Sequence, residues 1–178
     1  MMATKLKLRF YGDPCLRKPA QRVKSVGPAE RLIIHEMAQA MYEFEGSGLA
    51  APQVGIDQLI FVADVGEGPF AVINPEFLHK SSQETVLDEG CLSLPKIRVN
   101  VSRPEVVRVR YFDEMGRQVE RDLSSLMAKV FQHESDHLQG RMIVDYASKE
   151  EKEKFKEQLA YLESLYKKPV SRSKAHAR

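Results

Sequence analysis

Two histidines flanking a glutamate give this sequence its clearest capacity for chemistry. Positions 133–137 read HESDH and lie in a stretch that we expect to be helical. Residues four apart lie on one face of a helix, one turn apart, so His133 and His137 can bind one metal ion. Glu134 lies beside the first histidine and can take a proton from a metal-bound water and return it to a leaving amine. The pattern therefore predicts a metal-dependent hydrolytic centre.

The same five-residue pattern can also occur on a solvated helix that binds no metal. Here Leu126 and Val130 extend the stripe that carries His133 and His137, so the histidines share a face that is apolar one or two turns earlier. Such a face is more often buried than solvated. This context favours a metal site.

A catalytic metal usually has three protein ligands and one open position. Cys91 is the candidate for the third ligand, because a thiolate binds zinc or ferrous iron well and Gly90 lets the backbone approach closely. The alternative for Cys91 is an inert buried thiol. The adjacent Glu89 and Gly90, and a helix with two unpaired ligands, favour the metal role. Cys15 has no such neighbours and is interpreted as a packing residue.

A glycine-rich segment, GSGLAAPQ at positions 46–53, is the third candidate element. It lacks the Lys-Ser/Thr of a phosphate-binding loop, which argues against nucleotide binding. Its small residues would let an extended substrate lie close to the backbone, and Gln53 offers an amide donor that could polarise a carbonyl. Alone, the segment would be interpreted as a simple connection between a helix and a strand.

The surrounding elements indicate an α+β fold, with antiparallel β-sheets packed around the metal-binding helix and flanking helices near both ends. Pro28 suits the start of the first helix, which Gly46 and Gly48 would end. Ser124 can cap the central helix, which would run to about Gln139. The expected strands cover residues 59–65, 70–73, 106–112 and 117–123.

A last helix is expected after Ser148, which forms a capping-box pattern with Glu151. Its apolar face comprises Phe155, Leu159, Leu162 and Tyr166. We expect a single catalytic domain over residues 1–166 and a basic, disordered tail over residues 167–178.

Composition narrows the class of protein. The 178 residues are 43% hydrophobic and 29% charged, which is typical of a globular domain. The net charge of +2 argues against DNA binding, and no apolar run is long enough to span a membrane. Neither a secretory signal nor a disulfide framework is apparent, so we expect a cytoplasmic protein. The C-terminal helix and basic tail could contact an anionic partner such as the ribosome; a solvated tail is the simpler alternative.

Three segments together resemble the signature motifs of peptide deformylases, in the same order and at suitable separations. They are residues 46–53, 89–93 and 132–138. The resemblance begins at residues 12–17, extends to Asp145 and covers nearly the whole chain. It implies hydrolysis of the N-formyl group from the N-terminal formylmethionine of nascent polypeptides, by a metal-bound hydroxide and with release of formate.

The resemblance also implies roles for individual residues. The metal ligands would be Cys91, His133 and His137, and the metal would be ferrous iron, with zinc, nickel or cobalt as possible substitutes. Glu134 would be the general acid and base. Gln53 and the backbone N–H of Leu92 would stabilise the oxyanion.

An apolar slot for the methionine side chain is expected beside the metal. Leu126 and Val130 are well placed on the helical stripe, and Leu87 should point the same way as Glu89, two residues later on a strand. Leu87 and Glu89 are therefore both expected among the substrate-binding residues. The resemblance adds the backbone of Gly48 and the side chain of Arg98 as peptide-binding elements. It also implies that Arg103 pairs with Asp136, which would support the metal-binding helix.

The sequence departs from the family pattern at three positions near the slot. Ser47 replaces a frequent branched aliphatic residue, and Ser125 and Lys129 stand where many members have glycine and arginine. None of them is a candidate ligand, so the departures bear on substrate preference.

Two other functions fit parts of the pattern. A metallopeptidase of different specificity would take its third ligand downstream of the histidines, from Glu153 or Glu157. A non-catalytic protein with a structural metal would need four protein ligands and would leave Glu134 without a role.

Overall fold

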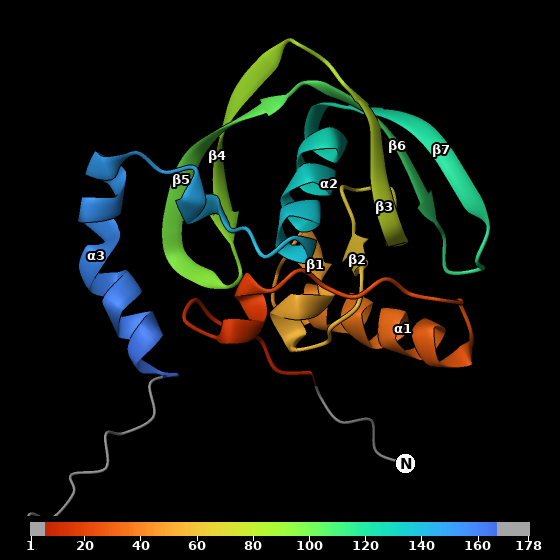
Figure 1. Cartoon of the computed structure of the whole chain (residues 1–178), viewed down its shortest axis with the longest axis horizontal. Helices are drawn as coiled ribbons and strands as arrows, with labels where there is room; N and C mark the ends of the chain where they lie inside the picture. The colour runs from red at the N-terminus through yellow and green to blue at the C-terminus, as the bar shows by residue number, and fades with distance from the viewer. Residues whose placement is uncertain (1–5, 167–178) are drawn as a thin grey trace, which may run out of the picture.

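A computed structural model describes residues 6–166; the first five residues and the predicted basic tail, residues 167–178, lie outside this range. The described chain forms three α-helices, α1 (Pro28–Glu43), α2 (Ser125–Leu138) and α3 (Lys149–Ser164), as Figure 1 shows. It also forms the strands β1 (Gly48–Ala50), β2 (Ile60–Ala63), β3 (Phe70–Lys80), β4 (Glu84–Cys91), β5 (Leu94–Pro104), β6 (Val106–Phe112) and β7 (Gln118–Ser124). Short 3-10 turns cover Pro14–Arg17, Ala51–Val54 and Ile143–Asp145.

All strand pairs are antiparallel. Five strands form one sheet in the order β1-β2-β3-β6-β7, and β4 and β5 form a separate two-stranded sheet. Helix α2 runs between the two sheets, and α3 lies outside β4 and β5 (Figure 1). The predicted α+β class, with a central helix and flanking helices, is confirmed.

The two faces of α2 have different partners. One face packs Ala128, Phe131 and Leu138 into the five-stranded sheet, where all three are fully buried. The ring of Phe131 meets those of Phe61 and Phe77 edge-on, with centroids 5.0 and 5.7 Å apart. Such aromatic pairs stabilise beyond their burial by about 0.5–1.5 kcal/mol. This packing orients the opposite face, which carries the histidines, away from the sheet and towards β4.

Helix α1 supports the edge of the sheet next to the site. Met37 and Met41 are fully buried in a core that includes Leu49 of β1 and Val62 of β2. The helix ends at Glu43, earlier than the two glycines that we expected to end it, because Phe44 leaves helical geometry and Glu45 turns back at φ 57°. The glycine-rich segment then enters the sheet as β1.

Other boundaries also differ from the sequence-based expectations. Strand β3 continues to Lys80, with register shifts between residues 73 and 79, and β5 lies where no separate strand was expected. Ser124 occupies the N-cap of α2, but its side chain forms no capping hydrogen bond. The capping box of α3 is confirmed, since Glu151 N–H donates to Ser148 Oγ and Ser148 N–H donates to the carboxylate of Glu151.

Helix α3 is held by the N-terminal segment as well as by β5. The N–H of Phe10 donates to the hydroxyl of Tyr166 at 2.9 Å. Leu162 is buried with residues of β5, and Phe155 and Leu159 pack beside it.

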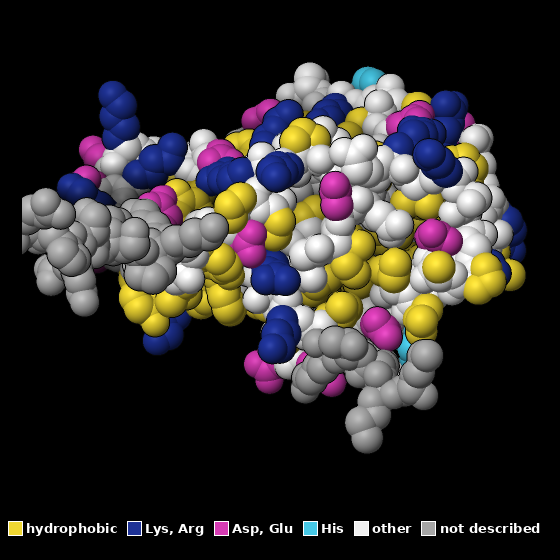
Figure 2. Space-filling model, turned by 60° about the horizontal axis from the view of Figure 1, so that its bottom comes forward, with side chains coloured by type: hydrophobic (Ala, Val, Ile, Leu, Met, Phe, Trp, Pro, Cys, Tyr) yellow, Lys and Arg dark blue, Asp and Glu magenta, His cyan; other side chains and the backbone are white. Residues whose placement is uncertain are grey.

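No helix within residues 6–166 is long and apolar enough to cross a membrane. On the face drawn in Figure 2, basic and acidic side chains are interspersed rather than separated into blocks.

Gly12 is the tightest point of this α3 contact. A Cβ on Gly12 would lie 2.5 Å from the Cα of Glu163, and Gly12 has φ +101°. Gly66 has a similar φ of +105° with no atom within 4 Å, so it is a matched control for backbone strain alone. We expect Gly66→Ala to lower the free energy of unfolding by about 1 kcal/mol, and Gly12→Ala to lower it by roughly 3 kcal/mol because overpacking adds to the strain. Urea unfolding of both variants measures the difference, and equal losses would show that α3 is not docked as described.

Candidate metal centre

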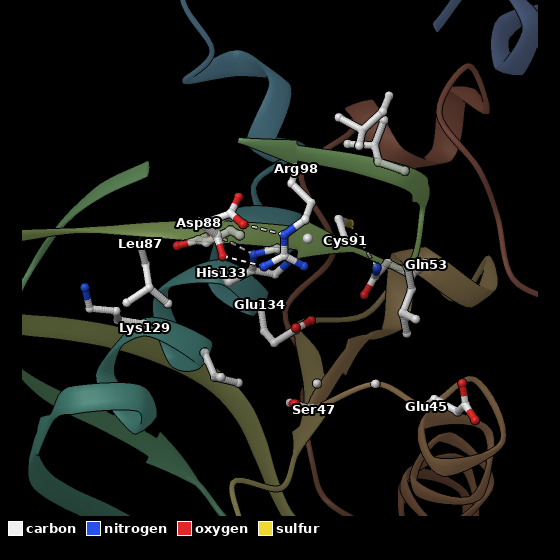
Figure 3. A pocket seen from close by; sticks show the side chains of 18 of the residues that line it. Glu45, Ser47, Gln53, Leu87, Asp88, Cys91, Arg98, Lys129, His133 and Glu134 are labelled. Carbon is white, nitrogen blue, oxygen red and sulfur yellow. Dashed lines mark hydrogen bonds and ion pairs between the residues drawn. The ribbon is translucent and has the colours of Figure 1, made fainter. Parts of the chain in front are cut away.

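A cavity of about 620 Å³ opens between α2, β4 and the segment that leads into β1. Its walls come from segments far apart in the sequence, as Figure 3 shows. The candidate residues that line it are Gly48, Gln53, Leu87, Glu89, Cys91, Leu92, Arg98, Leu126, Val130, His133 and Glu134.

Three potential ligand atoms converge beside this cavity. The sulfur of Cys91 and one ring nitrogen each from His133 and His137 all lie within 4.8 Å of one another. Cys91 Sγ is 3.2 Å from His137 Nε2, and the two imidazole rings are 5.1 Å apart at 70°. One thiolate and two imidazoles suit a divalent metal such as zinc or ferrous iron, and three ligands leave a coordination position open. The residues present therefore fit a catalytic metal.

Burial and neighbouring charge act differently on the two histidines. Burial lowers the pKa of His137 well below its usual value, which leaves the neutral ring that ligates metals. Burial also opposes the charged form of His133, but hydrogen bonds to Cys91 and Glu89 outweigh it and raise the pKa of His133. A proton on His133 must leave when a metal binds, so metal uptake competes with protons.

Glu134 is a buried carboxyl group that faces the site. Only 4% of the residue is exposed, and its Oε2 atom has no hydrogen-bond partner among the described residues. Burial raises its pKa from 4.5 to about 7. A carboxyl group with such a pKa can both accept and release a proton near neutral pH, which general acid–base catalysis requires.

The strand β1 approaches Glu134 closely at Gly48. A Cβ on Gly48 would lie 2.3 Å from Glu134 Oε1. Only glycine therefore fits at this position while the carboxyl group keeps its place.

Gln53 is fixed on the opposite side of Cys91 from the helix. Its Oε1 accepts from the N–H of Ala50 at 2.8 Å, and its Nε2 donates to Ser93 Oγ at 3.2 Å and lies 3.7 Å from Cys91 Sγ. The side chain is only 1% exposed, so these bonds hold the amide donor beside the metal ligands.

A buried ionic network orients His133. Glu89 accepts from His133 Nδ1 at 2.9 Å and from two nitrogens of Arg103 at 2.6 and 2.9 Å. Arg103 also donates to Asp136 at 2.8 Å, and Tyr146 donates its hydroxyl to the same carboxylate oxygen at 2.8 Å. The bond at Nδ1 leaves Nε2 of His133 to face the cavity.

The expected pairing of Arg103 with Asp136 is present and buried on the arginine side. Glu89 was expected among the substrate-binding residues. It lines the cavity, but Arg103 and His133 occupy its carboxylate, so a contact between Glu89 and the substrate stays a prediction. The Arg103–Glu89 pair and the Tyr146 contact were missed. On the paired strands Arg103 lies opposite Thr85 and Glu89 lies opposite Val99, so strand register gave no signal for the Arg103–Glu89 pair.

Leu87, Leu126 and Val130 line the cavity together, as the sequence predicts. Exposure decreases along this stripe of α2, from 51% at Leu126 to 1% at His137.

Arg98 is exposed at the mouth of the cavity, where its guanidinium donates to the side chain and the carbonyl of Asp88 at 2.6 and 2.7 Å. Cys15 packs against the core that includes β5 and lies apart from the ligand group.

Removing the guanidinium of Arg103 should destabilise the fold in a pH-dependent way. Burial alone would raise the pKa of Glu89, but Arg103 and His133 lower it from 4.5 to about 2. This depressed pKa contributes stability that is complete above pH 4.5 and is lost as the pH falls towards 2. We expect Arg103→Met to lower the free energy of unfolding by about 3–5 kcal/mol at pH 7, because the buried carboxylate of Glu89 loses its positively charged partner and both guanidinium hydrogen bonds.

Urea unfolding between pH 7 and pH 3 tests this expectation. The difference in the free energy of unfolding between the wild type and Arg103→Met should become smaller as the pH falls. Arg110→Met is the matched control, because the side chains of the Arg110–Glu120 pair are 39% and 34% exposed, against 5% and 7% for Arg103–Glu89, and a solvated pair should be worth less than about 1 kcal/mol. A difference that stays constant with pH would contradict the assigned role of Glu89.

Comparison with known proteins agrees with this geometry. The sequence model of the polypeptide deformylase family matches residues 5–153. A peptide deformylase of Thermotoga neapolitana is 50% identical over 139 residues, covering 78% of this chain and 85% of the relative. The crystal structure of peptide deformylase from Thermotoga maritima is 46% identical, has a TM-score of 0.80, and the match covers 82% of this chain and 99% of that one. A peptide deformylase from Synechococcus elongatus, solved in complex with actinonin, is 38% identical with a TM-score of 0.84, over 90% of this chain and 88% of that one. The chain therefore belongs to the polypeptide deformylase family.

Proposed function

We propose that Cys91, His133, His137, Glu134 and Gln53, with the backbone of Leu92, carry out the reaction of this family in the present chain. That reaction is the metal-dependent removal of the N-formyl group from nascent polypeptides. The observation that carries the assignment is the convergence of one sulfur and two imidazole nitrogens beside a buried carboxyl group with a pKa of about 7.

The ligand set explains why a metal is needed. A divalent metal at these three atoms would lower the pKa of a water molecule to roughly 7 and so supply a nucleophile at neutral pH. The hydrogen bond that His133 Nδ1 donates to Glu89 holds this ring in position for the metal, and the ring of His137 lies 5.1 Å away at 70° to it. Ferrous iron is our proposal for the native metal, with zinc, nickel or cobalt as substitutes.

The remaining groups handle protons and charge. Glu134 would take the proton of the attacking water and later deliver it to the amine as the carbon–nitrogen bond breaks. Gln53 Nε2 and the N–H of Leu92 would donate to the formyl oxygen as it gains negative charge. The hydrogen bonds of Gln53 to Ala50 and Ser93 keep this donor in place before substrate arrives.

The first side chain of the substrate would enter the space lined by Leu87, Leu126 and Val130. The backbone of Gly48 would lie along the peptide, and Arg98 would contact it at the cavity mouth. We also propose that the reaction takes place in the cytoplasm and that α3 and the following basic residues contact the ribosome.

The alternative of a metallopeptidase with a third ligand on the last helix has less support. Glu153 pairs with Lys156 on an exposed face of α3, and its side chain is 71% exposed. Neither Glu153 nor Glu157 belongs to the group of converging ligand atoms within the described residues. Cys91 is therefore the better third ligand.

Two substitutions separate metal binding from proton transfer. Cys91→Ser should weaken zinc binding by more than the ~10–100-fold typical of losing an outer partner of a ligand. Glu134→Gln should bind zinc with wild-type stoichiometry and lose about 10²–10⁴-fold in kcat. The measurements are zinc titration of chelator-treated protein and formate release from a formyl-Met peptide. Full metal binding by Cys91→Ser would favour the metallopeptidase alternative, and an active Glu134→Gln would exclude the proposed proton transfer.

Gly48→Ala tests the close approach of β1 to the carboxyl group. The new Cβ would meet Glu134 Oε1 at 2.3 Å and displace it, and the three atoms nearest to this Cβ all belong to Glu134 rather than to a metal ligand. We expect kcat/KM to fall about 100-fold, since a misplacement of about 1 Å has that effect, while zinc stoichiometry stays at the wild-type value. Unchanged kcat/KM would show that Glu134 does not need this position.

A further inference from the structure

Lys129 is a buried basic residue in the wall of the substrate cavity. It lies on α2, one helical turn before His133, and only 5% of the residue is exposed. It nevertheless lines the cavity. The mechanism proposed above gives it no role.

The ammonium group of Lys129 is anchored on the facing strand. Nζ donates to the carbonyl of Thr85 at 3.2 Å and also to the Thr85 hydroxyl. No carboxylate pairs with it among residues 6–166. A buried ammonium is unfavourable unless it is hydrogen-bonded, so the two acceptors of Thr85 fix where the side chain ends. The aliphatic stem therefore spans the gap from α2 to β4.

The location of the stem defines one end of the cavity. In Figure 3, Lys129 and Leu87 lie at one side, Cys91 and Gln53 at the other, and Glu134 between them. A substrate whose formyl group is beside Cys91 would direct its first side chain towards Lys129. The four methylenes of the stem offer it an apolar surface, as lysine stems commonly do.

We propose that Lys129, held by Thr85, closes the far end of the side-chain pocket and limits the length of the first side chain that the enzyme accepts. This inference rests on the proposed placement of the formyl group at the metal ligands. An unanchored lysine would extend its ammonium into solvent and open the pocket. The hydrogen bonds to Thr85 prevent that movement, so Thr85 acts as a positioning residue for the wall.

The experiment compares two formyl peptides that differ only in the length of the first side chain. One begins with norleucine, which has the length of methionine, and the other with 2-aminooctanoic acid, which has two more methylenes. Both are mixed in one reaction with the zinc-loaded full-length enzyme, and the ratio of their kcat/KM values is measured from product formation.

Lys129→Ala should raise the ratio of kcat/KM for the long substrate to kcat/KM for the short substrate at least about 10-fold. Each methylene that fits or fails to fit an apolar pocket changes kcat/KM by roughly that factor. Thr85→Val should shift the ratio in the same direction by a smaller factor, since the carbonyl anchor remains. Lys156→Ala, an exposed lysine on α3, should leave the ratio unchanged.

Each outcome bears on the proposal. A ratio within twofold of the wild type in both Lys129→Ala and Thr85→Val would overturn it, and Thr85→Val keeps the test valid if Lys129→Ala does not fold. A second comparison, between formyl peptides that begin with glutamate and glutamine, addresses the charge. If the wild type prefers glutamate and Lys129→Met abolishes that preference, Lys129 is an anion receptor rather than a wall. Failure of the wild type to deformylate the norleucine peptide would instead contradict the proposed function itself.

Discussion

The site depends on a guanidinium group placed in the interior between β5 and α2. Arg103 is 4% exposed and joins two carboxylates, Glu89 on β4 and Asp136 on α2. Through Glu89 it fixes the ring of His133, and through Asp136 it fixes the helix that carries both histidines. A charge buried at this depth is tolerated only when its partners are complete. The two-stranded sheet and the helix are thus held in one relative position, which is the position that metal binding needs.

Much of the chemistry could be predicted from the sequence because residue type and spacing determine it locally. The four-residue separation of His133 and His137 places them on one helical face whatever the rest of the fold does. The thiol of Cys91, with Glu89 and Gly90 beside it, favours this residue as their partner, and the motif resemblance implies the same role, although no local rule brings residues 42 positions apart together. The structure places its sulfur beside both rings.

Other features could not be predicted because they arise from tertiary packing. Residues 48–50, Gly-Leu-Ala, have little intrinsic preference for a strand, and they form β1 because α1 and β2 bury Leu49. The pairing of Glu89 with Arg103 could not be predicted, because the two residues are 14 positions apart and do not lie opposite each other on β4 and β5. Lys129 likewise resembles an exposed helical lysine, and only the approach of β4 shows that its charge is buried.

The contact between Tyr166 and Phe10 has a consequence for biosynthesis. The two residues are 156 positions apart, so the hydroxyl that receives the Phe10 amide is made long after that amide has left the ribosome. Chains are synthesised from the N-terminus, and early segments begin to fold before later ones exist. The segment around Phe10 must therefore wait, with its donor open to water, until α3 has been translated. This enzyme acts on chains that are still being synthesised, but its own tertiary structure is completed only after its synthesis has reached Tyr166.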